Sequence, residues 1–152
     1  MKERWRRSEK EMLTIDKNDI EGITMLSVEE ARKLPQWILA DGNRWWLRSS
    51  GRDRYDAAGI CGDGSILSLG RPIRDAGAYV RPAIKINVRP YLPLMIGETV
   101  LILGRLAQFV GNDAVLLCES IGCHRFDEKC NDYEKSEIKV YLEGWLDEEL
   151  KK

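Results

Sequence analysis

The sequence predicts a mixed α+β domain with short twisted strands, hairpins and two or three helices. Its length of 152 residues suits one compact hydrophobic core. Brief apolar segments separated by glycine-containing turns fill the middle of the chain, a pattern typical of short strands. Near the end, apolar residues recur at three- and four-residue steps, as they do in an amphipathic helix. Disorder, collagen-like repeats and a disulfide miniprotein are excluded by a hydrophobic share of 43% and a charged share of 32%.

The expected organisation is a charged N-terminal arm over residues 1–12 and a single α+β domain over residues 13–152. Within the domain, residues 13–90 form one half, 91–97 a linker, and 98–152 a strand–strand–helix half. The start of the chain has no apolar run of the kind that a secretory signal contains. The longest apolar stretches are far shorter than the roughly twenty residues that a bilayer requires. We therefore expect a cytoplasmic protein without a membrane segment.

The first firm element is a short helix after Ser27. The hydroxyl of Ser27 can accept a hydrogen bond from the Glu30 amide while the Glu30 side chain reaches back, which is a capping box. This helix is expected to stop before Pro35.

Short strands are expected over residues 57–61 and 65–69, with Asp63 and Gly64 between them. This pair favours the positive φ angles of a two-residue hairpin turn. A further strand is expected over residues 80–88, where apolar and polar residues alternate. The hairpin, the segment at residues 45–51 and this strand are predicted to share one sheet, packed on the same core as the C-terminal helix.

The second half begins after a stretch with two prolines and no periodicity, residues 87–97, which includes the linker. Strands are then expected over residues 99–103, 106–110 and 114–119, the last two joined through a Gly-Asn-Asp turn. A final helix can be capped by Ser136. Its apolar stripe comprises Ile138, Tyr141, Leu142, Trp145, Leu146 and Leu150.

The net charge of −1 hides an asymmetry between the halves. Residues 1–90 carry a charge of +4 and residues 91–152 a charge of −5. The two halves could neutralise each other across the folded interface, or the first could offer a basic face to an anionic partner.

The four cysteines, Cys61, Cys118, Cys123 and Cys130, are expected to be thiols, because disulfides do not persist in a reducing compartment. An oxidised pair is expected only if the chain was cut from a secreted protein. The cysteines near His124 lack the paired short spacings of structural zinc sites, so we expect no metal. Cys123 and His124 are neighbours in sequence, which disfavours a nucleophile–base pair.

Two blocks, WWLRSSG at residues 45–51 and VRPA at residues 80–83, resemble the signature of a bacterial domain family of unknown function. In that family a WWLRSPG-like segment precedes VRPA by about thirty residues. Residues 23–31 are similar to the family's FLLSxEEA element, and Asp63-Gly64 to its central hairpin. These domains are in turn distantly similar to the C-type-lectin-like fold of formylglycine-generating enzymes. The resemblance implies that fold for this chain.

The second half resembles a part of the family that normally comes earlier. Residues 114–117 are similar to its ALLIS strand, Arg125-Phe126 to its RPFN turn, and residues 133–142 to its YxxSxIRxYLN helix. The order of blocks is therefore swapped. Either the chain is a circular permutant, or it holds the end of one copy and the start of another. In the second case two chains could exchange halves as a homodimer. The copper chemistry of the catalytic relatives needs two cooperating cysteines, and Cys61 has no companion that matches a motif.

Arginine is concentrated between residues 44 and 89, a region with a single lysine. Guanidinium groups suit carboxylate and phosphate geometry. Arg48 and Arg81 belong to the signature and are expected to brace the core in ion pairs. Four others lie at expected turns and are the candidate binding residues: Arg52, Arg54, Arg71 and Arg74.

The tryptophans are interpreted as structural. Trp45 and Trp46 are adjacent on an expected strand, so one should enter the core and the other face the opposite side. Core packing is favoured for them over stacking on bases or sugars. Trp145 lies on the helix stripe and is expected in the core.

The function expected from this resemblance is that of a non-catalytic binding or inhibitory protein of bacterial or mobile-element origin. It would recognise a macromolecule, with a protein as the favoured partner, through the arginine loops and without a cofactor. The alternative is an adaptor or inhibitor that meets nucleic acid or a nucleic-acid-processing enzyme. A small metalloenzyme is the third class. Steep loss of binding with salt would favour the second class, and stoichiometric metal the third.

Overall fold

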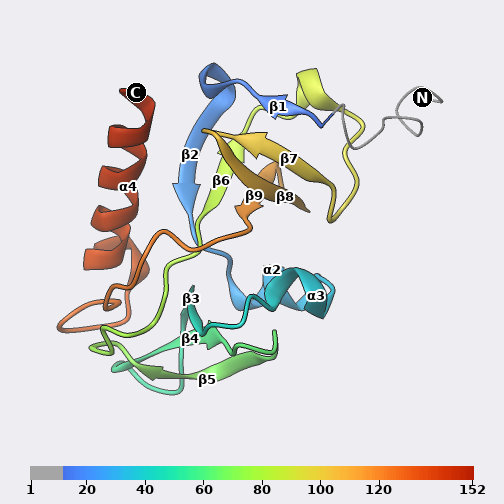
Figure 1. Ribbon diagram of the computed structural model, residues 1–152. Helices are drawn as coiled ribbons and strands as arrows, with labels where there is room; N and C mark the ends of the chain where they lie inside the picture. The colour runs from blue at the N-terminus through green and yellow to red at the C-terminus, as the bar shows by residue number, and fades with distance from the viewer. Residues whose placement is uncertain (1–11) are drawn as a thin grey trace.

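The computed structural model describes residues 12–152, and within them two β-sheets combine with α-helices (Figure 1). The α+β class is thus confirmed. The arm expected over residues 1–12 lies, apart from Met12, outside the described residues. No helix of residues 12–152 has both the length and the apolar character that crossing a membrane requires.

The larger sheet has six strands in the order β1-β7-β8-β9-β6-β2. Their bounds are β1 (Thr14–Ile15), β2 (Ile20–Thr24), β6 (Ala83–Ile86), β7 (Thr99–Ile102), β8 (Arg105–Gly111) and β9 (Ala114–Leu117). Only β1 and β7 pair in parallel, and all other neighbours are antiparallel. Because β6 lies between β9 and β2, the segments before and after residues 91–97 build the same sheet.

The smaller sheet contains β3 (Trp45–Ser50), β4 (Asp56–Ile60) and β5 (Ile66–Pro72), in that order. The predicted hairpin is confirmed, but its turn differs. Gly64 has a φ of +90°, whereas Asp63 stays outside the positive-φ region. The turn is closed by the Gly64 amide, which donates to the Cys61 carbonyl at 2.9 Å. Between β8 and β9 the turn expected over Gly111-Asn112-Asp113 has two residues, because Gly111 belongs to β8; φ is 50° at Asn112 and 56° at Asp113.

The expectation that both signature blocks share one sheet is wrong. β3 belongs to the smaller sheet, whereas VRPA leads into β6 of the larger one. Tyr79 still pairs with β3, since its carbonyl accepts from the Trp46 amide at 3.1 Å. Pro82 has no N–H with which to continue that ladder. Residues 83–86 pair instead with β9 and β2, so the strand is also shorter than the predicted 80–88.

The helices are α2 (Val28–Arg32), α3 (Gln36–Leu39) and α4 (Glu137–Leu150), with 3₁₀ turns at Lys17–Asp19, Arg89–Tyr91 and Tyr133–Lys135. The capping box expected at Ser27 and the helix cap expected at Ser136 are both present. Helix α3, which begins directly after Pro35, was not expected. In Figure 1, α2 and α3 lie between the two sheets and α4 lies beside the larger sheet.

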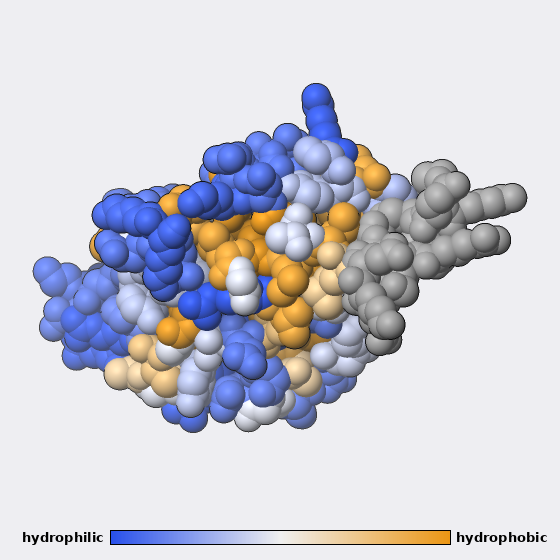
Figure 2. Space-filling view, turned by 45° about the horizontal axis from the view of Figure 1, so that its top comes forward, coloured by the Kyte–Doolittle hydropathy of each residue, from blue (hydrophilic) through white to orange (hydrophobic). Residues whose placement is uncertain are grey.

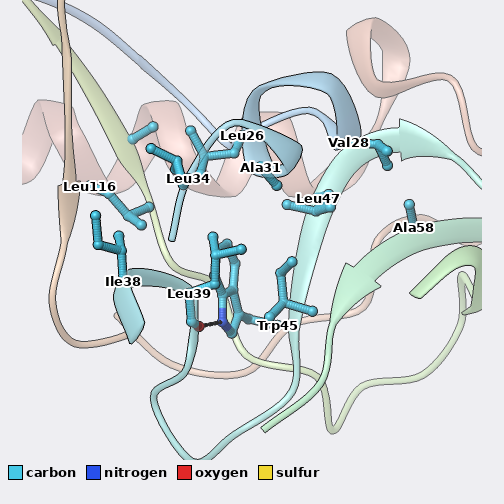
Figure 3. Packing of buried hydrophobic residues seen from close by; sticks show 12 residues of the cluster. Leu26, Val28, Ala31, Leu34, Ile38, Leu39, Trp45, Leu47, Ala58 and Leu116 are labelled. Atoms are coloured by element: carbon cyan, nitrogen blue, oxygen red, sulfur yellow. Dashed lines mark hydrogen bonds between the residues drawn. The ribbon is translucent and has the colours of Figure 1, made fainter. Parts of the chain in front are cut away.

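The core consists of three adjoining apolar clusters. The first joins α2 and α3 to the inner face of the smaller sheet and includes Trp45, whose Nε1 donates to the Leu39 carbonyl at 3.0 Å (Figure 3). The second holds Trp46, Phe126 and the base of α4. Both tryptophans of the doublet are therefore buried, on opposite faces of β3, which confirms that they pack in the core. The third cluster lines one face of the larger sheet.

Candidate arginine surface

Two of the candidate arginines, Arg52 and Arg54, lie in the loop between β3 and β4 and are exposed. The loop backbone is fixed, because the Arg52 amide donates to the Leu69 carbonyl at 2.7 Å and the Tyr55 amide to the Asp53 carboxylate at 2.9 Å. The Arg54 guanidinium stands 5.2 Å from the centre of the Tyr55 ring, itself 56% exposed. Neither guanidinium has an ion pair among residues 12–152, so both are presented outward on a rigid loop.

Arg71 lies in β5 and not at a turn, which corrects the expectation, and its side chain is held more firmly. Its Nη1 lies 3.2 Å from Asp75 Oδ2, and Arg44 Nη2 lies 3.3 Å from the same oxygen. Burial raises the pKa of Asp75, but the Gly77 amide and the two arginines outweigh it, so that pKa is lowered overall. Two guanidinium groups thus share one carboxylate, which leaves one positive charge uncompensated at this cluster. The sequence had indicated the arginines of this cluster but not the carboxylate of Asp75 that they share.

Arg74 donates from Nε to the Glu128 carbonyl at 2.9 Å. Arg74 therefore contacts the loop before α4. The same loop also contacts the β3–β4 loop, which carries Arg52 and Arg54. Asn131 Nδ2 donates to the carbonyls of Asp53 and Asp56, at 2.8 and 2.9 Å. No sequence pattern had indicated Asn131, because its role depends on a contact 75 or more residues away.

The two arginine loops meet at one end of the smaller sheet. The Ile73 amide donates to the Tyr55 carbonyl at 2.9 Å, and Asp56 pairs with Pro72 in the β4–β5 register. Together with Arg44, the four candidates define what we call the arginine surface: Arg44, Arg52, Arg54, Arg71 and Arg74. Ion pairs among residues 12–152 join residues of the same half, so within these residues the two halves do not neutralise each other by direct pairing.

Arg48 and Arg81, the arginines of the signature, have structural contacts of different kinds. Arg48 forms the expected ion pair, with Nη1 at 2.7 Å from Glu30 Oε1. Arg81 is 2% exposed and has no carboxylate partner among the described residues, so the ion pair expected for it is wrong.

Three backbone carbonyls take the place of that carboxylate. Arg81 donates to Leu117, Ile38 and Leu39, at 2.6, 2.8 and 3.2 Å, and its guanidinium lies over the Trp45 ring. Carbonyl dipoles at the end of α3 thus stabilise the cation, and Arg81 ties α3 to β9.

Trp145 is only partly buried, which corrects the expectation of a core position. It packs against the third cluster with one side, while the Arg105 guanidinium lies 5.2 Å from its ring centre. Arg105 also reaches Glu149 at 3.4 Å. The Arg105 guanidinium therefore covers part of the Trp145 ring that the sequence pattern had placed in the apolar core.

In the cysteine region the cysteine and histidine side chains do not come together in one site. All four cysteines are unpaired, and no three metal-ligating side chains come together within residues 12–152. His124 stacks on Tyr141 with ring centres 4.5 Å apart, and its Nδ1 lies 2.6 Å from the Arg125 carbonyl. Burial raises the pKa of the Cys118 thiol, which leaves it in the less nucleophilic protonated form at neutral pH.

Apolar side chains also reach the surface. Trp37 is 61% exposed, and its ring lies against Gly97, beside the exposed Met95 and Ile96. In Figure 2 orange, apolar side chains gather at the centre of one face and blue, hydrophilic ones surround them.

Comparison with known proteins adds no relative: no protein-family model, curated protein or solved structure matches this chain.

Proposed function

We propose that this chain is a non-catalytic binding domain that recognises an acidic surface of a protein partner through the arginine surface. The observation that carries the proposal is the state of Arg52, Arg54 and Arg74. Their loops are tied by backbone hydrogen bonds, yet none of the three guanidiniums has an ion pair among residues 12–152. Because the loop backbone is already fixed, binding costs only the side-chain entropy, and arginines without an ion pair can contribute strongly to an interface.

The resemblance of the WWLRSSG and VRPA blocks to a bacterial, C-type-lectin-like family supports the same proposal. We place the protein in the cytoplasm of a bacterium, as an inhibitor or adaptor encoded by the cell or a mobile element. The pairing of β6, β9 and β2 within one chain supports circular permutation as the origin of the swapped block order. A cytoplasmic location also agrees with four reduced cysteines.

A nucleic-acid partner is the second candidate, and one observation favours it. Tyr55 is exposed next to Arg54, and an aromatic ring beside guanidinium groups is a surface on which bases can stack. Asp53 and Asp56 flank the same loop, however, and their charges would repel a phosphate backbone. An acidic protein can place its carboxylates at separate points that avoid these two aspartates, whereas the phosphates of a nucleic acid form a continuous line. We therefore favour a protein partner.

The experiment is a pull-down from the native host, followed by affinity measurement with the protein that it identifies. Arg52→Ala with Arg54→Ala should weaken binding about tenfold or more, because two interface guanidiniums are lost. The melting temperature should stay nearly unchanged, since neither side chain has an ion pair. Arg71→Ala with Arg74→Ala should weaken binding too, with a small loss of stability from the Asp75 and Glu128 contacts.

The matched control is Lys17→Ala with Arg89→Ala, which removes the same charge from exposed positions in the 3₁₀ turns before β2 and after β6 of the larger sheet. If Lys17→Ala with Arg89→Ala weakens binding as much as Arg52→Ala with Arg54→Ala, the effect comes from net charge alone and the proposal is contradicted. A log–log salt slope of several units, together with binding to any oligonucleotide, would favour the nucleic-acid candidate instead.

A further inference from the structure

A groove of about 270 Å³ lies between the first helices and the β4–β5 hairpin. Its floor is apolar and comes from Ala31, Leu34, Leu39 and Ile66, while Arg32, Gln36 and Ser65 form the rim. The volume is several times the roughly 30 Å³ that one water molecule occupies in the liquid. The groove is thus large enough for a branched aliphatic or aromatic side chain.

The walls of this groove are preorganised. Gln36 Nε2 donates to the Asp63 carbonyl at 2.7 Å, which fixes the hairpin turn to α3. Gly64 lies so close to α3 that a Cβ there would come within 2.6 Å of the Gln36 carbonyl. Ala31 and Leu39 belong to the first cluster, whose packing Figure 3 shows. A side chain that enters the groove therefore meets fixed apolar atoms.

The groove runs beside the free edge of β5, the outer strand of the smaller sheet. The Cys61 amide donates to the Ser65 carbonyl at 2.8 Å, and the next hydrogen-bonded pair in an antiparallel ladder is two residues on, at Gly59 and Leu67. The N–H and C=O of Ile66, which lies between, therefore point away from β4. They are available to another strand.

The usable edge is short. The register of β5 shifts between Leu67 and Arg71, where Gly70 has a φ of +86°, and β5 ends at Pro72, which has no N–H. Bulges and prolines of this kind prevent long edge-to-edge pairing. An added strand is consequently limited to Ile66–Ser68, and the groove must supply much of its affinity.

From these observations we propose that β5 accepts a short extended segment of a partner protein as an added antiparallel strand, with one apolar side chain anchored in the groove. A residue opposite Ile66 has its side chain on the same face as that of Ile66, and Ile66 lines the groove. Backbone hydrogen bonds and one side-chain pocket then act together, as in other cases of strand addition.

The occupant is an acidic segment, by charge complementarity with the arginine surface at the other end of β5. Because β5 is bulged, Ile66 pairs with Ile60 and Arg71 with Ala57, three residues apart on β4 and so roughly 10 Å along a strand. Carboxylates about three residues before the apolar anchor would thus lie beside Arg71 and the loop of Arg52. This charge requirement rests on the proposed function, whereas the strand addition does not.

The test uses the ¹⁵N-labelled full chain and short peptides made of two glutamates, alternating threonine and valine, and a final anchor of leucine, phenylalanine or serine. The amides of Ile66 and Ser68 should shift and gain protection from hydrogen exchange with the leucine or phenylalanine anchor. The serine anchor should bind at least about tenfold more weakly, since it leaves the apolar floor uncovered. Absence of shifts at both amides with about 1 mM peptide would overturn the inference.

Two variants check the mechanism against matched controls. Ser68→Pro removes an edge N–H and Ser65→Trp fills the groove, and each should weaken peptide binding about tenfold or more. Ser68→Ala and Ser65→Ala should bind within about twofold of the unchanged protein. Retained affinity in both Ser68→Pro and Ser65→Trp would overturn strand addition.

The same experiment separates the two proposals. If peptides with glutamine in place of glutamate bind equally well at β5, strand addition stands and the arginine surface has no part in it. If Arg52→Ala with Arg54→Ala weakens binding of the host partner while no peptide perturbs Ile66, the proposed function stands and strand addition fails.

Discussion

Burial decides how the two signature arginines contribute to stability. Arg81 is enclosed and no carboxylate among residues 12–152 forms an ion pair with it. Burial lowers its pKa and the charge of Asp41 opposes this, but the pKa is lowered overall and the group stays charged. Arg48 is partly exposed and pairs with Glu30. Burial raises the pKa of Glu30, but Arg48 and the Ser27 amide outweigh it, so the pKa is lowered overall. Three buried carbonyls thus depend on Arg81 as their donor. The Arg48–Glu30 ion pair, in contrast, is partly solvated, so water can replace either partner.

Replacing Arg81 with methionine should therefore cost more than replacing Arg48. Arg81→Met leaves the carbonyls of Leu117, Ile38 and Leu39 without their donor and should lower the free energy of unfolding by about 3 kcal/mol. Arg48→Met should lower it by about 1 kcal/mol. Urea unfolding at neutral pH measures both. An equal or smaller loss for Arg81→Met would show that the carbonyls find other partners.

Asp127 is one of the carboxylates that make the stability fall at acid pH. Burial raises the pKa of Asp127, but amides of Lys129, Cys130 and Glu137 donate to its carboxylate and lower it below the ordinary 3.8. Because the folded pKa is the lower one, this stabilisation is complete above pH 3.8 and is lost as the pH falls through the folded value.

Asp127→Asn should consequently be about 2 kcal/mol less stable at pH 7, because an amide group cannot accept all three bonds. The difference from the unchanged protein should narrow steadily below pH 4. Urea unfolding from pH 7 to pH 3 measures it, with the exposed Asp147→Asn as control. A difference that stays constant with pH would contradict the assignment.

At the scale of elements, two glycines show that local propensity and tertiary packing can act in opposite directions. Gly144 lies inside α4, where a Cβ would meet no atom within 4 Å. Gly59 lies inside β4, where a Cβ would come within 2.8 Å of the Trp45 carbonyl. Glycine only weakens the helix, whereas in the strand it permits β3 and β4 to approach.

Gly144→Ala should raise the free energy of unfolding by about 1 kcal/mol, the helix preference of alanine over glycine. Gly59→Ala, the matched substitution, should lower it, since β3 must move away from β4. Thermal and urea unfolding report both changes. A stabilising Gly59→Ala would mean that the two strands are less closely packed than described.

At the scale of the whole molecule, the sheets share their core residues. The first cluster contains Ala83 and Leu116 of the larger sheet together with Trp45 and Ala58 of the smaller one. Ile23 and Ile121 pack against both the second and the third clusters. Neither sheet can therefore lose its packing without exposing the apolar face of the other.

Unfolding should accordingly be a single cooperative transition. Tryptophan fluorescence, to which Trp45 and Trp46 of the smaller sheet contribute, should give the same urea midpoint as far-ultraviolet circular dichroism, which reports on all elements. A fluorescence transition that precedes the loss of secondary structure would show that the smaller sheet unfolds independently.

Local signals in the sequence determined those elements that need only neighbouring residues. The Ser27 capping box, the Ser136 helix and the turn at Asn112-Asp113 follow from hydrogen bonds and φ preferences within a few residues. The same holds for the concentration of arginine in two loops. Composition and spacing could name Arg52, Arg54 and Arg74 at turns, whereas Arg71, also expected at a turn, lies in β5.

Tertiary structure alone decided the partners of these residues. The pairing of β1 with β7, the position of β6 between β9 and β2, and the Asn131 contacts join residues tens of positions apart. Such contacts form only after long loops close, and no local preference encodes which strand edge is met. For the same reason Arg81 reaches carbonyls instead of a carboxylate, and only the folded chain shows which arginines are left without a partner.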